Sequence, residues 1–237
     1  MLSLAIDSSQ DICALALGRD GQLLTELHFH HKMNLLRRLM PNVEQILSDA
    51  GHVVKDLDAV VISLGPGSFT GLRIGVTIAK TLAYTLAKPI VGVGTLDAIA
   101  RGCAPTSADL ICPMIHARTG EVYWSLFDSS GEVRLAEYEV ATVVHVLEEA
   151  AKRGASVHFC GSGAAKNAEA IRHRFGNSAL VEQAWSDFAR GAVLLEIGEK
   201  RLRDGIADDA LTLAPLYVKK PTPVVRLESG ELGKPKR

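Results

Sequence analysis

The sequence predicts an α/β protein made of two similar halves, and two observations lead to this prediction. Each half begins with three short segments of strand character separated by turns, and continues with a helix, a strand and a second helix. The second half also repeats patterns of the first: Ile6-Asp7-Ser8-Ser9 matches Ile115-His116-Ala117-Arg118, and the turn at Gly21 matches the turn at Gly131 with one residue inserted. We therefore expect a duplicated α/β fold with two βββαβα subdomains.

The subdomains are expected to cover residues 1–102 and 103–218, and a basic segment, 219–237, follows them. The 237-residue chain is 47% hydrophobic and 22% charged, which is ordinary for a globular protein. No stretch reaches the ~18–20 consecutive apolar residues of a membrane span, and Met1–Asp7 lacks the basic start of a signal peptide. These features, with four scattered cysteines that are expected to be free thiols, indicate a cytoplasmic protein that avoids membranes.

The expected elements of the first half follow from its apolar patterns and turn residues. The expected strands are Leu2–Asp7, Ile12–Leu17, Leu23–His30, Ala59–Leu64 and Ile90–Val93. The expected helices are Asn34–Ala50, Leu72–Ala87 and a short helix from Thr95 to Gly102. Pro41 removes an internal hydrogen bond and is expected to kink the first helix.

The second half gives the same pattern and ends in a charged segment. Its expected strands are Leu110–Ala117, Glu121–Asp128, Glu132–Val140 and Val157–Phe159, and its expected helices are Thr142–Arg153, Ala164–Phe175 and Ser186–Arg203. The net charge of the chain is −1, but the last twenty residues carry a balance of +4. Such a tail can contact the phosphate backbone of a nucleic acid, while a solvated terminus is the simpler interpretation. The sequence leaves both open.

A glycine-rich loop, Gly65–Gly71, joins an expected buried strand to an expected helix, where amide groups can face an anion. Two phosphate-binding motifs fail there. Leu72 follows Gly71 where a Walker A loop requires Gly-Lys-Ser/Thr, and Thr70 stands where the dinucleotide fingerprint requires a glycine. The loop is therefore interpreted as a tight turn around Gly65 and Gly67, with a helix cap at Ser68 or Thr70.

The helix after the loop carries a row of small residues on one face: Gly71, Gly75, Ala79 and Ala83. This row can pack on the chain's own sheet or allow a partner helix to approach closely. The helices Asn34–Ala50 and Leu72–Ala87 both carry more apolar residues than one core contact requires. We favour a docking role for both helices.

Four segments resemble the TsaB (YeaZ) family of bacterial proteins: Ala5-Ile6-Asp7-Ser8, the stretch from Gly65 to Val76, Ala117–Tyr123, and Pro215-Leu216-Tyr217-Val218. They follow one another in family order across nearly the whole chain. The resemblance implies an actin-like (ASKHA, ribonuclease H-like) fold and a role in making threonylcarbamoyladenosine in tRNA. It further implies a non-catalytic subunit that supports a sister protein, TsaD, which carries the metal and transfers threonylcarbamoyl to the adenosine next to the anticodon.

The resemblance also implies partners and a docking surface. TsaE, an ATPase, joins the larger complex, and the chain forms a homodimer when TsaD is absent. The family docks through its first two long helices, so the expected contact residues are Leu35, Leu39, Val43, Ile46, Phe69, Arg73, Ile74, Thr77 and Lys80. A Leu39→Asp change is expected to abolish binding of TsaD while the monomer stays folded. No catalytic residue, metal ligand or cofactor is expected in this chain alone, ATP or ADP is left open for the complex, and tRNA contact is expected to be indirect or through the tail.

Three catalytic alternatives remain less favoured. A metallopeptidase needs converging ligands, and His28 and His30 share a strand face, but no His-Glu-x-x-His motif is present. A stand-alone ATP-dependent enzyme of this fold needs carboxylates from both halves; Asp7 supplies one, but His116 stands where the family usually has an aspartate. A serine or threonine nucleophile at Ser8, Ser68 or Thr70 lacks a Gly-x-Ser-x-Gly elbow.

Overall fold

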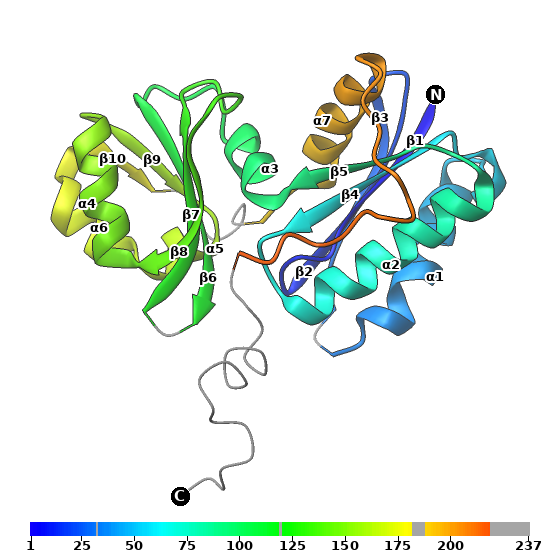
Figure 1. The fold of residues 1–237 in the computed structure, drawn as a ribbon, viewed down its shortest axis with the longest axis horizontal. Coiled ribbons are helices and arrows are strands. Elements are labelled where there is room, and N and C mark those ends of the chain that lie inside the picture. Colours follow the sequence, from blue (N-terminus) through cyan, green and yellow to red (C-terminus); the bar gives the residue numbers. More distant parts are fainter. Residues whose placement is uncertain (32, 119, 182–187, 219–237) are drawn as a thin grey trace, which may run out of the picture.

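The computed structural model describes residues 1–31, 33–118, 120–181 and 188–218, and these residues form two five-stranded sheets that lie side by side (Figure 1). The first sheet has the order β3-β2-β1-β4-β5. Its strands are β1 (Leu2–Asp7), β2 (Ile12–Arg19), β3 (Gln22–His30), β4 (Ala59–Gly65) and β5 (Ile90–Gly94). The first three strands are antiparallel, whereas β1, β4 and β5 are parallel, with Ile6 opposite Ile62.

The second sheet repeats this arrangement with the order β10-β9-β6-β7-β8. Its strands are β6 (Leu110–Arg118), β7 (Glu121–Asp128), β8 (Arg134–Thr142), β9 (Val157–Cys160) and β10 (Ala179–Val181). β6 pairs antiparallel with β7 and parallel with β9, as β1 does with β2 and β4. The predicted duplicated α/β fold is therefore confirmed; among the strands of the described residues only the three-residue β10 was not expected, and the helix expected over Ala164–Phe175 is divided into two.

Three apolar cores hold the sheets and their helices together. The helices are α1 (Leu35–Asp49), α2 (Phe69–Leu86), α3 (Thr95–Gly102), α4 (Val143–Arg153), α5 (Ser162–Lys166), α6 (Ala168–Phe175) and α7 (Gly191–Arg203), with two 3-10 turns at Val54–Asp56 and Gly176–Ser178. One core lies between the first sheet and α1 and α2, and another lies between the second sheet and α4 and α6. The third core, to which α3 and α7 contribute, joins the two sheets.

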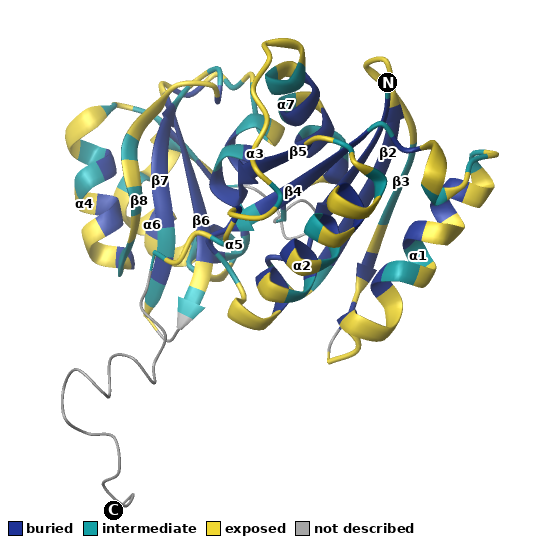
Figure 2. Ribbon diagram, turned by 45° about the vertical axis from the view of Figure 1, so that its right-hand side comes forward, coloured by how far each residue is buried: buried dark blue, intermediate teal, exposed yellow. Residues whose placement is uncertain are grey.

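Burial follows the sequence pattern (Figure 2). Every residue of β1 is buried, as expected for a central strand covered on both faces, while α1 and α2 show exposed residues on their outer surfaces. α1 is continuous through Pro41. α2 begins at Phe69, three residues before the expected start, because Ser68 caps it.

Residues 191–218, the last part of the described chain, pack on the first sheet rather than on the second. α7 packs on β1, β2 and β5 of the first sheet. The segment after it continues along the same half: the amide of Asp208 donates to Ile90 O (2.8 Å), and the amide of Leu216 donates to Leu64 O (2.7 Å). The expectation that residues 103–218 form one subdomain is thus wrong for residues 191–218, because apolar residues of α7 complete the core on the first sheet.

Candidate functional site

The turn between β1 and β2 lies directly against the glycine loop. The amide of Ser68 donates to Ser9 O (2.6 Å), and Ser8 Oγ donates to Gly71 O (2.9 Å). A Cβ added at Gly67 would lie 2.2 Å from Ser9 O, and one added at Gly71 would lie 2.1 Å from Ser8 O. Both glycines are therefore required because two backbone segments meet there, rather than because a ligand approaches.

Ser68 is the N-cap of α2, since its hydroxyl accepts a hydrogen bond from the amide of Gly71 (3.2 Å), and Thr70 lies exposed in the first turn. Gly65 has a φ of +106°, which favours glycine in the turn. The small-residue row of α2 is buried in the chain's own fold: it consists of Gly71, Gly75, Ala79 and Ala83. The interpretation of this row as a partner surface is wrong, because it brings the helix onto the β1–β2 turn and the first sheet.

Asp7 lies at the end of β1 and is completely buried. Its Oδ1 accepts hydrogen bonds from the Ser63 hydroxyl and from the amide of Ser9 (3.2 Å). Burial raises the pKa of Asp7 above its usual range, and the hydrogen bonds from Ser63 and Ser9 oppose this rise. The carboxylate does not line the space between the halves, so it is not placed to bind a ligand there.

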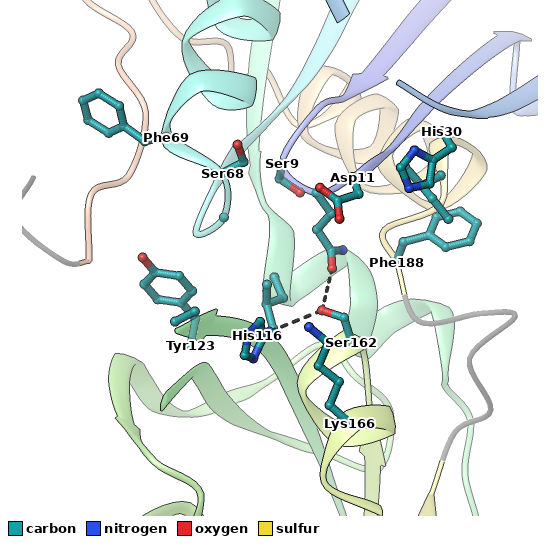
Figure 3. A pocket seen from close by; sticks show the side chains of 15 residues that line it. Ser9, Asp11, His30, Ser68, Phe69, His116, Tyr123, Ser162, Lys166 and Phe188 are labelled. Carbon is teal, nitrogen blue, oxygen red and sulfur yellow. Dashed lines mark hydrogen bonds between the residues drawn. The ribbon is translucent and has the colours of Figure 1, made fainter. Parts of the chain in front are cut away.

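A cleft of about 620 Å³ lies between the two halves. Figure 3 shows that Ser9 and Ser68 of the first half face His116, Tyr123, Ser162 and Lys166 of the second half. The cleft is further lined by Gln10, Asp11, Ile12, His30, Gly67, Phe69, Ile115, Ala117 and Phe188. Asp11 is the single carboxylate among these lining residues, and it is exposed.

A hydrogen bond between Ser162 and Gln10 crosses the cleft. Ser162 Oγ donates to Gln10 Oε1 (2.9 Å) and accepts from the amide of His116 (3.3 Å). Among the described residues, the buried Ser9 hydroxyl and Gln10 Nε2 have no hydrogen-bond partner. Partial burial, with a contribution from the nearby Lys166 charge, lowers the pKa of His116. The cleft thus offers hydroxyl, amide and ammonium donors, which suit an anion better than a magnesium ion.

Three histidines lie in β3 or directly after it, and their side chains have separate contacts rather than a common site. His28 contacts Glu26 (Nε2 to Oε1, 3.0 Å), His30 lines the cleft, and His31 Nε2 lies 2.9 Å from Gln10 O. Within the described ranges, no three His, Cys, Asp or Glu side chains are gathered as ligands for a metal ion.

The four contact residues expected on α1 are buried in the chain's own core: Leu35, Leu39, Val43 and Ile46 are at most 3% exposed. They form the inner stripe of the helix, which packs on β2 and β3. Their assignment to a partner surface is therefore wrong. Leu39→Asp would place a charge in the core, so we now expect this variant to destabilise the monomer itself.

The outer surfaces of α1 and α2 carry a different apolar set. Leu36 of α1 is 68% exposed and Tyr84 of α2 is 67% exposed, and Met33 just before α1 is 97% exposed. Of the residues expected on α2, Thr77 is exposed and Ile74 is half-buried. Leu36 and Tyr84 were missed because they fall outside the most continuous apolar stripe of each helix.

Two other residues expected at the docking surface, Arg73 and Lys80, form hydrogen bonds with the segment after α7. Arg73 lies over the ring of Phe69 (3.9 Å from guanidinium carbon to ring centroid) and donates from Nε to Tyr217 OH (3.1 Å). Lys80 Nζ donates to the carbonyls of Leu213 (2.7 Å) and Leu211 (3.1 Å). The partners of these side chains are therefore intramolecular in this structure.

Comparison with known proteins agrees with this geometry. Residues 30–222 match the family model described as TsaD: tRNA N6-adenosine threonylcarbamoyltransferase, so the chain belongs to that family. The chain is also 32% identical over 224 residues to the tRNA threonylcarbamoyladenosine biosynthesis protein TsaB of Bacillus subtilis (strain 168), covering 92% of this chain and 97% of the relative. This chain is a TsaB (YeaZ) family member.

Solved structures extend the comparison. YeaZ from Pseudomonas aeruginosa has a TM-score of 0.74 and 26% identity to this TsaB family chain, covering 91% of the chain and 99% of that structure. The ROK hexokinase from Thermus thermophilus has a TM-score of 0.50 and 13% identity, covering 86% and 100%, and shows the fold alone. Both support the actin-like architecture of the family. No helix in the described part of the chain is long and apolar enough to span a membrane.

Proposed function

We propose that this TsaB family chain is a non-catalytic subunit of a tRNA-modifying complex. In this proposal it binds TsaD and, with TsaE, supports the transfer of threonylcarbamoyl to the tRNA adenosine next to the anticodon. The names of its relatives and the matching family model support the pathway. ATP or ADP acts at the level of the complex, the tail 219–237 or the partner contacts tRNA, and the complex works in the cytoplasm.

The observation that carries the proposal is the exposed apolar surface on the outer sides of α1 and α2. Large exposed apolar side chains outside a core mark interaction surfaces when they gather on neighbouring elements. Here Leu36 and Tyr84 lie exposed on two helices that cover the same face of the first sheet, and Met40, Ile74 and Ile78 of these helices are half-buried against its core. A standard interface buries about 1,600 Å² in total, which two helices of 15 and 18 residues can supply.

The buried position of Asp7 supports the non-catalytic part of the proposal. Kinases and ATPases of this architecture hold a metal–nucleotide complex with carboxylates from both halves. In this chain the first carboxylate is enclosed by Ser63 and Ser9, and the matching position in the second half is a histidine. A stand-alone ATP-dependent enzyme is therefore the second candidate, and a metallopeptidase has no gathered ligand set in the described residues to favour it.

The test of the docking surface uses two variants matched in exposure. Leu36→Asp places a charge on α1, where Leu36 is 68% exposed, and Val144→Asp places one on α4 of the second half, where Val144 is 66% exposed. We expect Leu36→Asp to weaken TsaD binding at least about tenfold, because a desolvated charge at an interface costs more than 1.4 kcal/mol. Circular dichroism and thermal unfolding are expected to match the wild type for both variants.

Val144→Asp is the control and is expected to bind TsaD like the wild type. Equal binding by Leu36→Asp and wild type would exclude this surface as the interface. The same Leu36→Asp variant is expected to shift a homodimer to monomer in light scattering, because the proposed homodimer uses the same surface.

The function itself is tested by reconstitution. The purified chain is expected to restore threonylcarbamoyl transfer when it is mixed with TsaD, TsaE, tRNA and the threonylcarbamoyl donor, and to hydrolyse neither ATP nor peptides alone. Turnover of ATP by the chain alone, abolished by a substitution in the cleft such as Ser162→Ala, would favour the enzyme candidate instead.

A further inference from the structure

The segment after α7, drawn in orange in Figure 1, runs beside α2 on the side of the first sheet that α1 and α2 cover. We refer to its residues 208–217 as the strap. Both ends of the strap are fixed to the sheet: Asp208 Oδ2 accepts a hydrogen bond from the amide of Gly92 in β5 (2.7 Å), and the amide of Leu216 donates to Leu64 O of β4 (2.7 Å). Between these ends, Leu213 is buried in the same core as the inner residues of α1 and α2. The strap is therefore a third element of this side of the molecule.

Two long side chains of α2 bind the strap along its length. Lys80 Nζ donates to the carbonyls of Leu213 (2.7 Å) and Leu211 (3.1 Å), and Arg73 Nε donates to Tyr217 OH (3.1 Å). Arg73 and Lys80 are seven residues apart, which is about two helical turns, so both point from the same side of α2. These hydrogen bonds fix the strap against one flank of the helix.

Leu211 lies in a turn of the strap that leaves its side chain in solvent. The amide of Leu211 donates to Asp209 Oδ1 (2.8 Å), and the amide of Leu213 donates to Asp209 O (2.8 Å). The side chain of Leu211 is nevertheless 70% exposed, whereas that of Leu213 is buried. The turn thus holds one leucine in the core and presents the other at the surface.

The exposed Leu211 lies beside the part of α2 that carries Tyr84. Lys80, which binds the carbonyl of Leu211, precedes Tyr84 by four residues, and side chains with this spacing are neighbours on a helix surface. A single exposed leucine is ordinary, but exposed apolar side chains that continue from one packed element to the next mark an interaction surface. The surface that begins with Leu36 on α1 and Tyr84 on α2 therefore continues onto the strap.

We propose that the strap is part of the TsaD docking surface: TsaD covers Leu211 together with Tyr84 and Leu36, and Lys80 is a positioning residue that holds Leu211 in place. This inference rests on the proposed function and extends its docking surface from two helices to three elements. The Lys80 ammonium is already bound by two carbonyls of the strap, so the patch is apolar rather than cationic. It suits the apolar centre of a protein interface better than the phosphate backbone of RNA.

The first test compares two exposed apolar residues of the segment after α7. Leu211→Asp places a charge in the strap, and Ile206→Asp places one where Ile206 is 55% exposed and its amide donates to Arg201 O (2.8 Å) at the end of α7. α7 contributes to the core on the other face of the first sheet, so Ile206 lies away from α1 and α2. We expect Leu211→Asp to weaken TsaD binding at least about tenfold and Ile206→Asp to bind like the wild type, with unchanged thermal unfolding of both.

The Leu36→Asp variant separates failure of this inference from failure of the proposed function. Wild-type binding of TsaD by Leu211→Asp, with binding weakened in Leu36→Asp, would overturn the role of the strap and leave the docking function in place. Loss of only TsaE binding, or only of the homodimer, in Leu211→Asp would also overturn it, because another partner would then cover the strap. Wild-type binding of TsaD by both variants would exclude the whole surface.

Hydroxyl-radical labelling of the wild-type complex tests coverage of the strap without a substitution. On addition of TsaD, labelling of Leu211 and Tyr84 is expected to fall to the level of the buried Leu39, whereas labelling of Ile206 is expected to stay unchanged. Undiminished labelling of Leu211 in the complex would overturn the proposal even if Leu211→Asp weakens binding.

The positioning role of Lys80 is tested with Lys80→Met and Lys80→Arg. Methionine cannot donate to the two carbonyls of the strap, so Lys80→Met is expected to weaken TsaD binding about threefold or more, while Lys80→Arg retains donors and is expected to bind like the wild type. In a Leu211→Asp background, Lys80→Met is expected to add no further loss, because its effect acts through Leu211. Wild-type binding by Lys80→Met, or an equal loss in both backgrounds, would overturn this role of Lys80.

Discussion

The two halves of the molecule share one strand order but differ at the end of their first strand. In the first half, Asp7 is completely buried, and the glycine loop with the start of α2 closes over the turn that follows it. In the second half, His116 is exposed and lines the cleft, while the glycine-containing loop after β9 packs on Met114 two residues earlier. The two halves therefore share the arrangement of their strands. In the first half alone, the end of the first strand is buried against the glycine loop and α2.

The same contrast holds for the outer helices. α1 and α2 of the first half have 15 and 18 residues, whereas α4 and α6 of the second half have 11 and 8. The longer pair carries the exposed Leu36 and Tyr84, and the proposed docking surface lies on this pair. Each of the following substitutions tests one part of this difference between the halves.

The largest effect is expected from Gly71→Ala, compared with Gly163→Ala in the corresponding loop of the second half. A Cβ at Gly71 would lie 2.1 Å from the backbone oxygen of Ser8, whereas one at Gly163 would lie 3.0 Å from the nearest atoms of Met114. The helix-propensity gain of about 1 kcal/mol for alanine cannot offset the first clash. We expect a loss of about 3 kcal/mol for Gly71→Ala and about 1 kcal/mol for Gly163→Ala in urea unfolding. Equal losses would mean that the two loops are packed alike.

The next effect concerns a polar contact between the halves, beside the apolar core that joins the two sheets. Tyr138 of β8 donates its hydroxyl to Asp97 Oδ2 of α3 (2.6 Å), and Arg134 Nη2 contacts both oxygens of Asp97 (3.0 and 3.1 Å). Tyr138→Phe removes one partly buried hydrogen bond to a charged group, and we expect a loss of about 1.5–2 kcal/mol in the free energy of unfolding. Tyr84→Phe on exposed α2 is the matched control and is expected to change stability by less than about 0.5 kcal/mol. A similar cost at both positions would show that this contact does not stabilise the arrangement of the halves.

The sequence predicted which segments of both halves form strands, apart from β10, because apolar periodicity and turn residues are local signals. It placed α1 and α2 correctly but chose the wrong side of α1 for docking. The stripe Leu35, Leu39, Val43 and Ile46 is the most continuous one on that helix, and such a stripe is buried first in the helix's own domain. Leu36, one position away, had no separate signal.

Other differences came from long-range packing. The sequence around Gly191 does not predict that α7 packs on the first sheet, because this packing depends on contacts with residues more than a hundred positions away. Patterns of polarity predict which elements form, while contacts between distant elements decide which side chains remain available.

A smaller effect is expected at Asp7, because the buried carboxylate makes the free energy of unfolding depend on pH. Its folded pKa is raised by burial, so the native state binds more protons than the unfolded state at pH values just above 3.8. Stability therefore falls as pH rises through that window, and the ionised group costs stability at neutral pH. Asp7→Asn removes this cost and is expected to be about 1 kcal/mol more stable than the wild type at pH 7. The advantage is expected to shrink toward pH 4, measured by urea unfolding at each pH.

A variant less stable than the wild type at every pH would contradict this account of Asp7. Asp11→Asn is the control, because Asp11 is exposed at the rim of the cleft and is expected to show no such pH-dependent advantage.

The smallest effect is expected at His116, and it has the opposite sign. Partial burial, with the charge of Lys166, lowers the folded pKa of His116 below 6.5, so the unfolded state binds more protons as pH falls through 6.5. Stability is therefore lost on acidification, not on a rise in pH. His116→Asn is expected to reduce this loss by less than about 0.5 kcal/mol between pH 7.5 and 5, because the side chain is exposed. Lys166→Gln in the wild-type background is expected to reduce it in the same direction, since it removes one of the two causes. If His116→Asn instead steepened the acid loss, the charged imidazole would be stabilised in the folded state, which would contradict the lowered pKa of His116.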